Sequence, residues 1–236
     1  MIKAVLFDLD NTLIDFMGMK RSSFEAAVKA MIRVGLRIKK ADAMELLHAL
    51  YRQHGIEHQK IFQKFLRAAI GRLDYRMLAE GIVAYRRMQA GIMMPYPDVI
   101  PTLRLLRKKG LRLAIVSDAP RMRAWLRLVE MGLQGYFDIV VCLEDTGNYK
   151  HTGLPFRKAL KLLGLNPEEC LMVGDWPERD IVGAKKAGIR TVFARYGATK
   201  KIRHSGADFE IVSVSGVTAV VKKLNARNSR RQIIEK

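Results

Sequence analysis

The chain has 236 residues, of which 49% are hydrophobic, enough to bury the core of one ordinary domain with an insertion or of two modest domains. Its 42 Lys and Arg residues outnumber its 23 Asp and Glu residues, so the net charge is +19. That charge favours anionic partners, whether nucleic acid, membrane or phosphorylated metabolites. The sequence shows no signal-peptide pattern, no membrane-spanning apolar run and no metal-binding cysteine pattern. We therefore expect a soluble cytoplasmic protein in which Cys142 and Cys170 are buried thiols.

The first predicted strand leads directly into two carboxylates. Residues 4–7 form an unbroken apolar run typical of a buried parallel strand, and Asp8, Asp10 and Thr12 follow it. Ligands of open α/β sheets bind at the carboxyl ends of the strands, so we expect both acids to face a substrate. Neighbouring carboxylates repel each other unless a cation lies between them, and Mg²⁺ is suited to carboxylate and phosphate oxygens. An ordinary turn is the alternative, because Asp, Asn and Thr favour turns.

The next apolar run that could form a buried strand lies at residues 111–116. A crossover between parallel strands needs only one helix, so an extra module is predicted between the two strands. We expect residues 16–95 to form an inserted bundle of four antiparallel helices. Capping boxes predict two of the helix starts, Asp74 marks another, and glycines mark the helix ends. The capping pairs are Ser22 with Glu25 and Asp42 with Glu45, and the glycines are Gly35, Gly55, Gly71 and Gly91.

From residue 96 onwards, apolar runs alternate with helical patterns. This alternation predicts a doubly wound parallel sheet with helices on both faces. We therefore expect an α/β core formed by residues 1–15 and 96–236, with the helical insert at residues 16–95. The predicted strands are 111–116, 139–143, 170–174, 191–194 and 209–212, and the predicted helices lie near 120–131, 154–163, 178–187 and 216–225.

Polar residues also follow the other predicted strands. Ser117 and Asp118 end one strand, where a hydroxyl and backbone amides can donate to phosphate, although a helix-capping role fits these residues as well. Asp175 and Asp180 follow Gly174, and Asp175 also fits a helix cap. Lys150 lies in the loop after residues 139–143, and a lone lysine of this kind is usually a solvated surface residue.

Taken together, these segments resemble the four motifs of the haloacid dehalogenase superfamily, in the branch with a helical cap after the first strand. The first motif spans Asp8 to Thr12, the second is Ser117, the third is Lys150, and the fourth comprises Gly174, Asp175 and Asp180. The third motif departs from the pattern: relatives often carry Lys-Pro there, whereas His151 follows Lys150 in this chain. The resemblance implies a Rossmann-like core and transfer of a phosphoryl group to an aspartate.

The resemblance also assigns roles to these residues. Asp8 would be the nucleophile, and Asp10 would protonate the leaving alcohol and later take a proton from water. Asp10 favours phosphoryl chemistry, because dehalogenating relatives lack this second acid; the family also uses its backbone carbonyl as a metal ligand. The implied Mg²⁺ ligands are Asp8, Asp10, Asp175 and Asp180, and the implied residues on the substrate and phosphate side are Thr12, Ser117, Asp118 and Lys150.

A cap that closes over the sheet would exclude water, which favours small phosphorylated metabolites over folded phosphoproteins. We therefore expect a magnesium-dependent phosphatase for substrates of the phosphoglycolate, triose or sugar phosphate, or nucleotide type. The alternatives are a phosphomutase, phosphonatase or dehalogenase of the same superfamily, or a basic nucleic-acid-binding protein on this fold. The sequence contains no recognised nucleic-acid module, so nucleic acid is the less favoured partner. No membrane association is expected, and the oligomeric state is left open.

Overall fold

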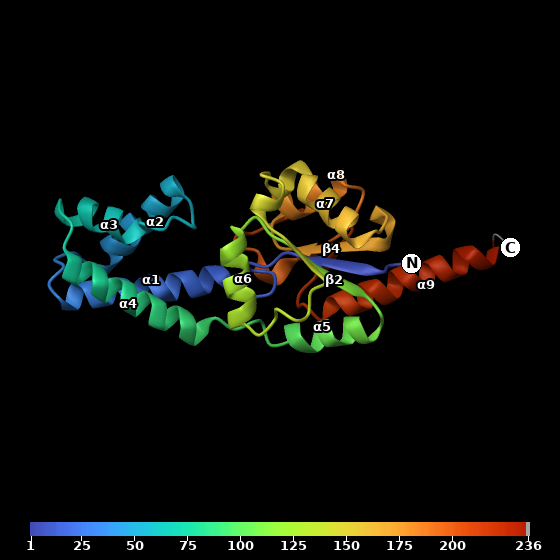
Figure 1. Cartoon of the computed structure of the whole chain (residues 1–236), viewed down its shortest axis with the longest axis horizontal. Helices are drawn as coiled ribbons and strands as arrows, with labels where there is room; N and C mark the ends of the chain where they lie inside the picture. The colour runs from blue at the N-terminus through green and yellow to red at the C-terminus, as the bar shows by residue number, and fades with distance from the viewer. Residues whose placement is uncertain (235–236) are drawn as a thin grey trace. The chain divides into compact units, whose positions relative to one another are not determined.

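The computed structural model describes residues 1–234 and divides the chain into two compact units. One unit comprises Met1–Asp15 and Met94–Lys236, and the other comprises Phe16–Met93 (Figure 1). We call them the core unit and the inserted unit. None of the helices within residues 1–234 is long and apolar enough to span a membrane.

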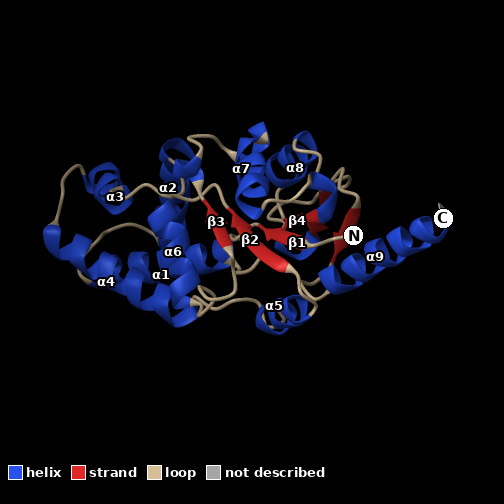
Figure 2. Ribbon diagram, turned by 45° about the vertical axis from the view of Figure 1, so that its right-hand side comes forward, coloured by secondary structure: helices blue, strands red, loops and turns tan. Residues whose placement is uncertain are grey.

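The core unit contains a parallel sheet of six strands in the order β3-β2-β1-β4-β5-β6. Figure 2 draws the strands in red and labels β1 to β4. The prediction of a doubly wound parallel sheet is confirmed. Each strand lies within about two residues of its predicted range. The strands are β1 (Ala4–Phe7), β2 (Arg112–Val116), β3 (Ile139–Val141), β4 (Cys170–Gly174), β5 (Arg190–Ala194) and β6 (Phe209–Ile211).

Strand β1 lies inside the sheet, between β2 and β4. Phe7 is opposite Ile115 on one side and Val173 on the other. All four β1 residues are fully buried, which explains why the sequence there is continuously apolar rather than alternating. Because the three strands run parallel and in register, the polar residues that follow them emerge at the same edge of the sheet.

Helices cover both faces of this sheet. Helices α7 and α8 lie on one face, and α5 and α9 lie on the other (Figures 1 and 2). On the first face, Leu6, Val116 and Met172 of the strands pack in one apolar cluster with Phe156 and Leu160 of α7. The helices of the core unit are α5 (Val99–Lys108), α6 (Arg121–Glu130), α7 (Leu154–Leu163), α8 (Val182–Lys186) and α9 (Gly216–Ile234).

The inserted unit contains four helices with a common apolar core. Helices α1 and α4 are the longest and lie side by side. Phe24 and Met31 of α1 pack in one cluster with Leu47, Phe65 and Leu78 from the other three helices. The helices are α1 (Phe16–Arg33), α2 (Lys40–His54), α3 (Ile61–Ile70) and α4 (Tyr75–Ile92).

The predicted ends of these helices are partly wrong. Helix α1 begins at Phe16 and not at Ser22, because Phe16 and Met19 are already buried and packing extends the helix toward its N-terminus. Helix α2 begins at Lys40, so Asp42 lies inside it and forms no cap. Only Asp74 caps as predicted, since its side chain accepts the Met77 backbone N–H at 2.9 Å.

One of the four glycine predictions also differs from the structure. Gly35 lies two residues after Arg33, the last residue of α1, as expected for a glycine near a helix end. Gly55 and Gly71 directly follow the last residues of α2 and α3, as predicted. Gly91 instead lies within the last turn of α4, which continues to Ile92. A glycine near the end of a helix costs only a fraction of a kcal/mol to about 1 kcal/mol relative to alanine, so the helix tolerates it.

A buried lysine lies inside the inserted unit. The Lys20 Nζ is 5.4 to 5.8 Å from the centroids of four aromatic rings, and it donates to the Ile56 carbonyl at 3.3 Å. Cation–π attraction stabilises an ammonium group in such surroundings. The rings are Phe16, Phe24, Tyr51 and Tyr85.

We predict that Phe156→Ala destabilises the protein by about 3–5 kcal/mol, because it leaves a cavity under the sheet. Phe156 is fully buried, whereas Leu162 of the same helix is 47% exposed and makes Leu162→Ala a matched control with a small expected effect. Urea unfolding followed by circular dichroism measures both variants. Equal losses for the two substitutions would contradict the assigned core.

Candidate active site

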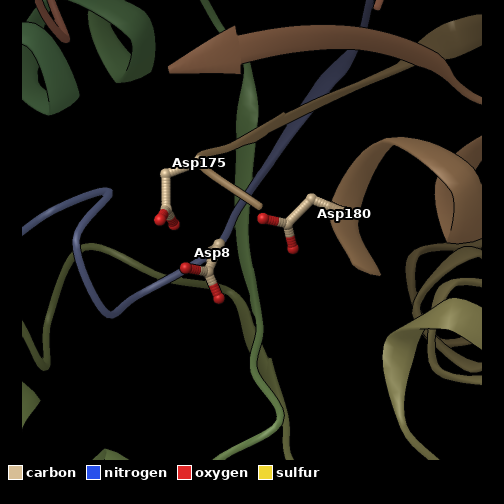
Figure 3. Close-up of side chains that lie close together, drawn as sticks. All are labelled: Asp8, Asp175 and Asp180. Carbon is tan, nitrogen blue, oxygen red and sulfur yellow. The ribbon is translucent and has the colours of Figure 1, made fainter. Parts of the chain in front are cut away.

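Three buried carboxylates converge at the carboxyl edge of the sheet. Asp8 follows β1, Asp175 follows β4, and Asp180 lies in the turn after β4. One oxygen from each lies within 4.8 Å of the others, and Figure 3 shows the three side chains facing a common space. Asp8 and Asp175 come together because β1 and β4 are neighbouring strands in register. Residues far apart in the sequence therefore form one acidic cluster.

The turn that carries Asp180 has unusual local geometry. Asp180 lies in a π-helical turn, η4 (Pro177–Ile181), and its Oδ2 accepts the Trp176 backbone N–H at 2.9 Å. Single π-helical turns recur at functional sites because they redirect a side chain. Gly174 makes room for this arrangement: a Cβ at that position would lie 2.3 Å from Asp180 Oδ2. The glycine before Asp175 is therefore required by the close approach of Asp180.

Lys150 supplies a positive charge within this cluster. Its Nζ forms ion pairs with Asp8 and, at 2.6 Å, with Asp180 Oδ1, and its side chain is only 4% exposed. Burial alone would lower the pKa of Lys150, but the charges of Asp180 and Asp8 outweigh that effect and raise it well above its ordinary value. Lys150 is therefore a cation at neutral pH and offsets part of the acidic charge.

Thr12 joins the two strand ends. Its buried Oγ1 lies 3.3 Å from Asp8 Oδ2 and 3.2 Å from Asp175 Oδ1, so the hydroxyl can donate to either carboxylate. Tyr196 lies in the turn directly after β5, and its hydroxyl donates to the Thr12 carbonyl at 2.8 Å. This bond attaches the turn that follows Asp10 to the end of β5. Asn11 adopts a left-handed backbone conformation, with φ of 62°, which lets the chain reverse directly after Asp10.

The electrostatic balance of the cluster favours a divalent cation. Burial and the neighbouring charges of Asp8 and Asp180 raise the pKa of Asp175, and burial also raises the pKa of Asp180. A single lysine does not neutralise three carboxylates. Mg²⁺ prefers hard oxygen ligands and binds through one or two carboxylates together with substrate phosphate. The donor set of Asp8, Asp175 and Asp180 therefore fits Mg²⁺.

The Asp10 carboxylate lies outside this cluster. Its Oδ2 accepts Arg127 Nη1 at 2.7 Å, and Arg127 is almost completely buried in α6. The Asp10 carboxylate is therefore not among the grouped oxygens of Asp8, Asp175 and Asp180, and a metal-binding role for Asp10 through its backbone carbonyl stays a prediction. Sequence reasoning missed Arg127, because α6 contains several arginines and no motif distinguishes one of them. Helical spacing gives a partial signal. Ala124 lies three residues before Arg127 and Leu128 one residue after it, and both are buried, so Arg127 lies on the buried side of α6.

Ser117 and Asp118 follow β2 as predicted and have different surroundings. The buried Ser117 Oγ accepts the Ala119 backbone N–H at 3.1 Å, which keeps its own proton available for another acceptor. Asp118 instead faces the loop of Lys150. Its Oδ1 accepts the Lys150 backbone N–H at 2.7 Å, and its Oδ2 accepts Arg179 Nη1 at 3.1 Å.

The sequence matches one known protein family over most of its length. The profile of the haloacid dehalogenase-like hydrolases matches residues 2–188 of this sequence. The match covers most of the chain and includes every residue of the acidic cluster together with Lys150 and Ser117. The chain belongs to the haloacid dehalogenase-like hydrolase family.

Two relatives and one solved structure are similar to this chain over most of their length. The chain is 33% identical over 225 residues to the glyceraldehyde 3-phosphate phosphatase of Methanocaldococcus jannaschii, with 95% of this chain and 99% of that protein covered. It is 31% identical over 201 residues to the phosphoglycolate phosphatase of Aquifex aeolicus, with 84% and 87% covered. The crystal structure of a HAD phosphatase from Thermococcus onnurineus is similar with a TM-score of 0.67 and 28% identity, and 93% and 98% of the two chains are covered.

We predict that Asp175→Asn stabilises the protein when divalent cations are absent, by on the order of 1–2 kcal/mol. Without a cation, folding must either bury the ionised Asp175 carboxylate beside like charges or protonate it, as its raised pKa shows, and an amide avoids both costs. Thermal unfolding in the presence of a chelator measures this effect. Mg²⁺ should raise the unfolding temperature of the wild-type protein and have little effect on the variant, since a ligand stabilises the state that binds it.

Glu130→Gln is the control, because it removes an exposed acid from α6. It should leave both the chelator result and the Mg²⁺ response unchanged. A variant at Asp175 that is less stable than the wild-type protein in chelator would contradict the assigned repulsion.

Proposed function

We propose that this hydrolase is a magnesium-dependent phosphatase of small phosphorylated metabolites and that it acts through an aspartyl phosphate on Asp8. The observation that carries the proposal is the position of Asp8: it is buried, in contact with Lys150, and grouped with Asp175 and Asp180. A carboxylate in such a place can act as a nucleophile toward phosphorus only if nearby positive charge offsets the repulsion from the phosphate.

The first step is the transfer of the phosphoryl group from the substrate to Asp8. An Asp8 oxygen attacks phosphorus while the bond to the leaving oxygen breaks, which forms the aspartyl phosphate. Lys150 offsets the negative charge of the carboxylates and the phosphoryl group, and the Ser117 hydroxyl donates to a phosphoryl oxygen. Asp8, Asp175 and Asp180, with the Asp10 backbone carbonyl, would hold Mg²⁺. When bound, the ion supplies charge neutralisation and orientation of the phosphate.

Asp10 provides the proton transfers. It gives a proton to the departing alkoxide in the first step, and it takes one from the water that attacks the aspartyl phosphate in the second. The products are the alcohol and inorganic phosphate, and Asp8 and Asp10 return to their starting states. Arg127 donates a hydrogen bond to Asp10 Oδ2 and helps to hold this carboxylate in place.

Similarity to proteins named for glyceraldehyde 3-phosphate and phosphoglycolate supports short phosphorylated metabolites as the substrates. The net charge of +19 adds long-range attraction for such anions. The presence of Asp10 favours hydrolysis of phosphate esters over displacement of halide, because an alkoxide needs a proton and a halide does not.

We expect purified protein to release phosphate from glyceraldehyde 3-phosphate, phosphoglycolate or another member of a phosphorylated-metabolite panel when Mg²⁺ is present, and chelator to stop the reaction. Asp8→Asn should abolish turnover, because an amide is not a competent nucleophile. Phosphate release is the measurement, and circular dichroism verifies that the variant is folded. Glu130→Gln should keep full activity. A folded wild-type protein that is inert toward the whole panel with Mg²⁺ present would refute the proposal.

The role of Asp10 predicts a dependence on the leaving group. Asp10→Asn should lower kcat/KM for alkyl phosphates by about 10²–10⁴-fold, and much less for 4-nitrophenyl phosphate, whose leaving group is stable without a proton. Arg127→Gln should show the same preference with a smaller amplitude, because it displaces the Asp10 carboxylate without removing it. Equal losses with both substrate types would argue against proton transfer by Asp10.

A further inference from the structure

The loop of Lys150 must be held in place without the proline that relatives often have there. Asp118 provides one attachment, because its Oδ1 accepts the Lys150 backbone N–H at 2.7 Å. A charged acceptor makes this a stronger hydrogen bond than one between neutral groups. Asp118 follows β2 and Lys150 follows β3, so the contact joins two neighbouring strand ends.

The second oxygen of Asp118 binds a third loop. Arg179 Nη1 lies 3.1 Å from Asp118 Oδ2, and Arg179 belongs to the π-helical turn that also carries Asp180. The guanidinium carbon is 4.2 Å from the ring centroid of Trp176 and 5.5 Å from that of Tyr149, the residue before Lys150. Stacking and cation–π attraction restrict an arginine placed in this way. One carboxylate therefore links the loops that follow β2, β3 and β4.

The other side of the Lys150 loop rests on helix α8. A Cβ at Gly183 would lie 1.9 Å from the Lys150 carbonyl oxygen, so only a glycine permits this approach. Lys186 Nζ donates to the His151 carbonyl at 3.0 Å. The backbone around Lys150 is thus held by Asp118 on one side and by α8 on the other.

We propose that Asp118 and Arg179 form a clamp that positions Lys150 against Asp8 and Asp180, and that Asp118 is not itself a phosphate contact. The proposal rests on the phosphatase function proposed above and assigns the role of two residues within it. An ionised carboxylate has no proton to donate to a phosphate oxygen, and both oxygens of Asp118 already accept hydrogen bonds from Lys150 and Arg179.

The position of Lys150 is important because its Nζ contacts Asp8 and Asp180 at once. A displacement of about 1 Å at a catalytic group can cost about 10²-fold in rate. In metal sites, mutation of a residue that orients a ligand through a hydrogen bond typically lowers metal affinity or activity by about 10–100-fold. In this proposal the clamp acts on catalysis through Lys150.

A double-mutant cycle tests this claim, because residues that act through one another show non-additive losses. We predict that Asp118→Ala lowers kcat for the best substrate of the panel by about 10–100-fold in the wild-type background. In a Lys150→Met background, Asp118→Ala should cause no further loss. Asp118→Asn should recover part of the activity, because the amide oxygen can still accept the Lys150 N–H. An equal factor in both backgrounds would overturn the proposal.

Arg179 has a parallel test. Arg179→Gln should lower kcat in the wild-type protein and have no added effect when combined with Asp118→Ala. Arg121→Gln is the matched control, since it also breaks an arginine–aspartate pair, with Asp145 at 2.7 Å, but one whose arginine side chain is 53% exposed. It should leave kcat and KM unchanged. Additive losses for Arg179→Gln and Asp118→Ala would overturn the proposal that these two residues act as one clamp.

Hydrogen exchange separates a failure of the clamp from a failure of the proposed function. In the wild-type protein the Lys150 amide should be protected, and Asp118→Ala should speed its exchange while amides in β1 keep their protection. This readout needs no turnover. Unchanged exchange at Lys150 in a folded Asp118→Ala protein would overturn the clamp, whether or not the enzyme is active on the panel.

Discussion

The proposed chemistry depends on three carboxylates that are buried together beside Lys150. Asp8, Asp175 and Asp180 repel one another, and Lys150 offsets only part of their charge. Such an arrangement is unfavourable for the fold by itself. It persists because the surrounding sheet is extensively buried, and it creates a site where a cation and a phosphoryl group are both attracted to a nucleophile. The same repulsion that makes the cluster unfavourable for folding therefore favours binding of a cation beside the proposed nucleophile.

Two kinds of structure position this cluster. The register of β1 with β4 fixes Asp8 against Asp175, because both follow paired strand ends. Loops provide the remaining groups: the π-helical turn presents Asp180, and the loop after β3 presents Lys150. Loops are inherently less fixed than strands, so their side chains need attachments. Thr12 joins the strand ends, and Asp118 links the loops.

The sequence predicted the sheet and the neighbourhood of Asp8 and Asp175 well, because each acid directly follows a short apolar run that is buried on both faces. It could not predict the partner of Asp10. The contact with Arg127 joins residues 117 positions apart, and nothing local to α6 distinguishes this arginine from its neighbours. The start of α1 was missed for a similar reason: burial of Phe16 and Met19 extends the helix past the local capping signal at Ser22.

In the proposed mechanism the phosphoryl group is transferred to Asp8 before it reaches water. The most direct measurement is mass spectrometry of the enzyme quenched in acid during turnover with Mg²⁺ and its best substrate, followed by peptide mapping. The proposed mechanism requires a phosphoryl group on the peptide that contains Asp8, formed and lost at rates that support turnover. With 4-nitrophenyl phosphate, whose leaving group needs no proton, Asp10→Asn should contain more of this adduct, because the variant slows attack by water. Rapid turnover without an adduct on Asp8, or with an adduct on another residue, would rule out Asp8 as the nucleophile.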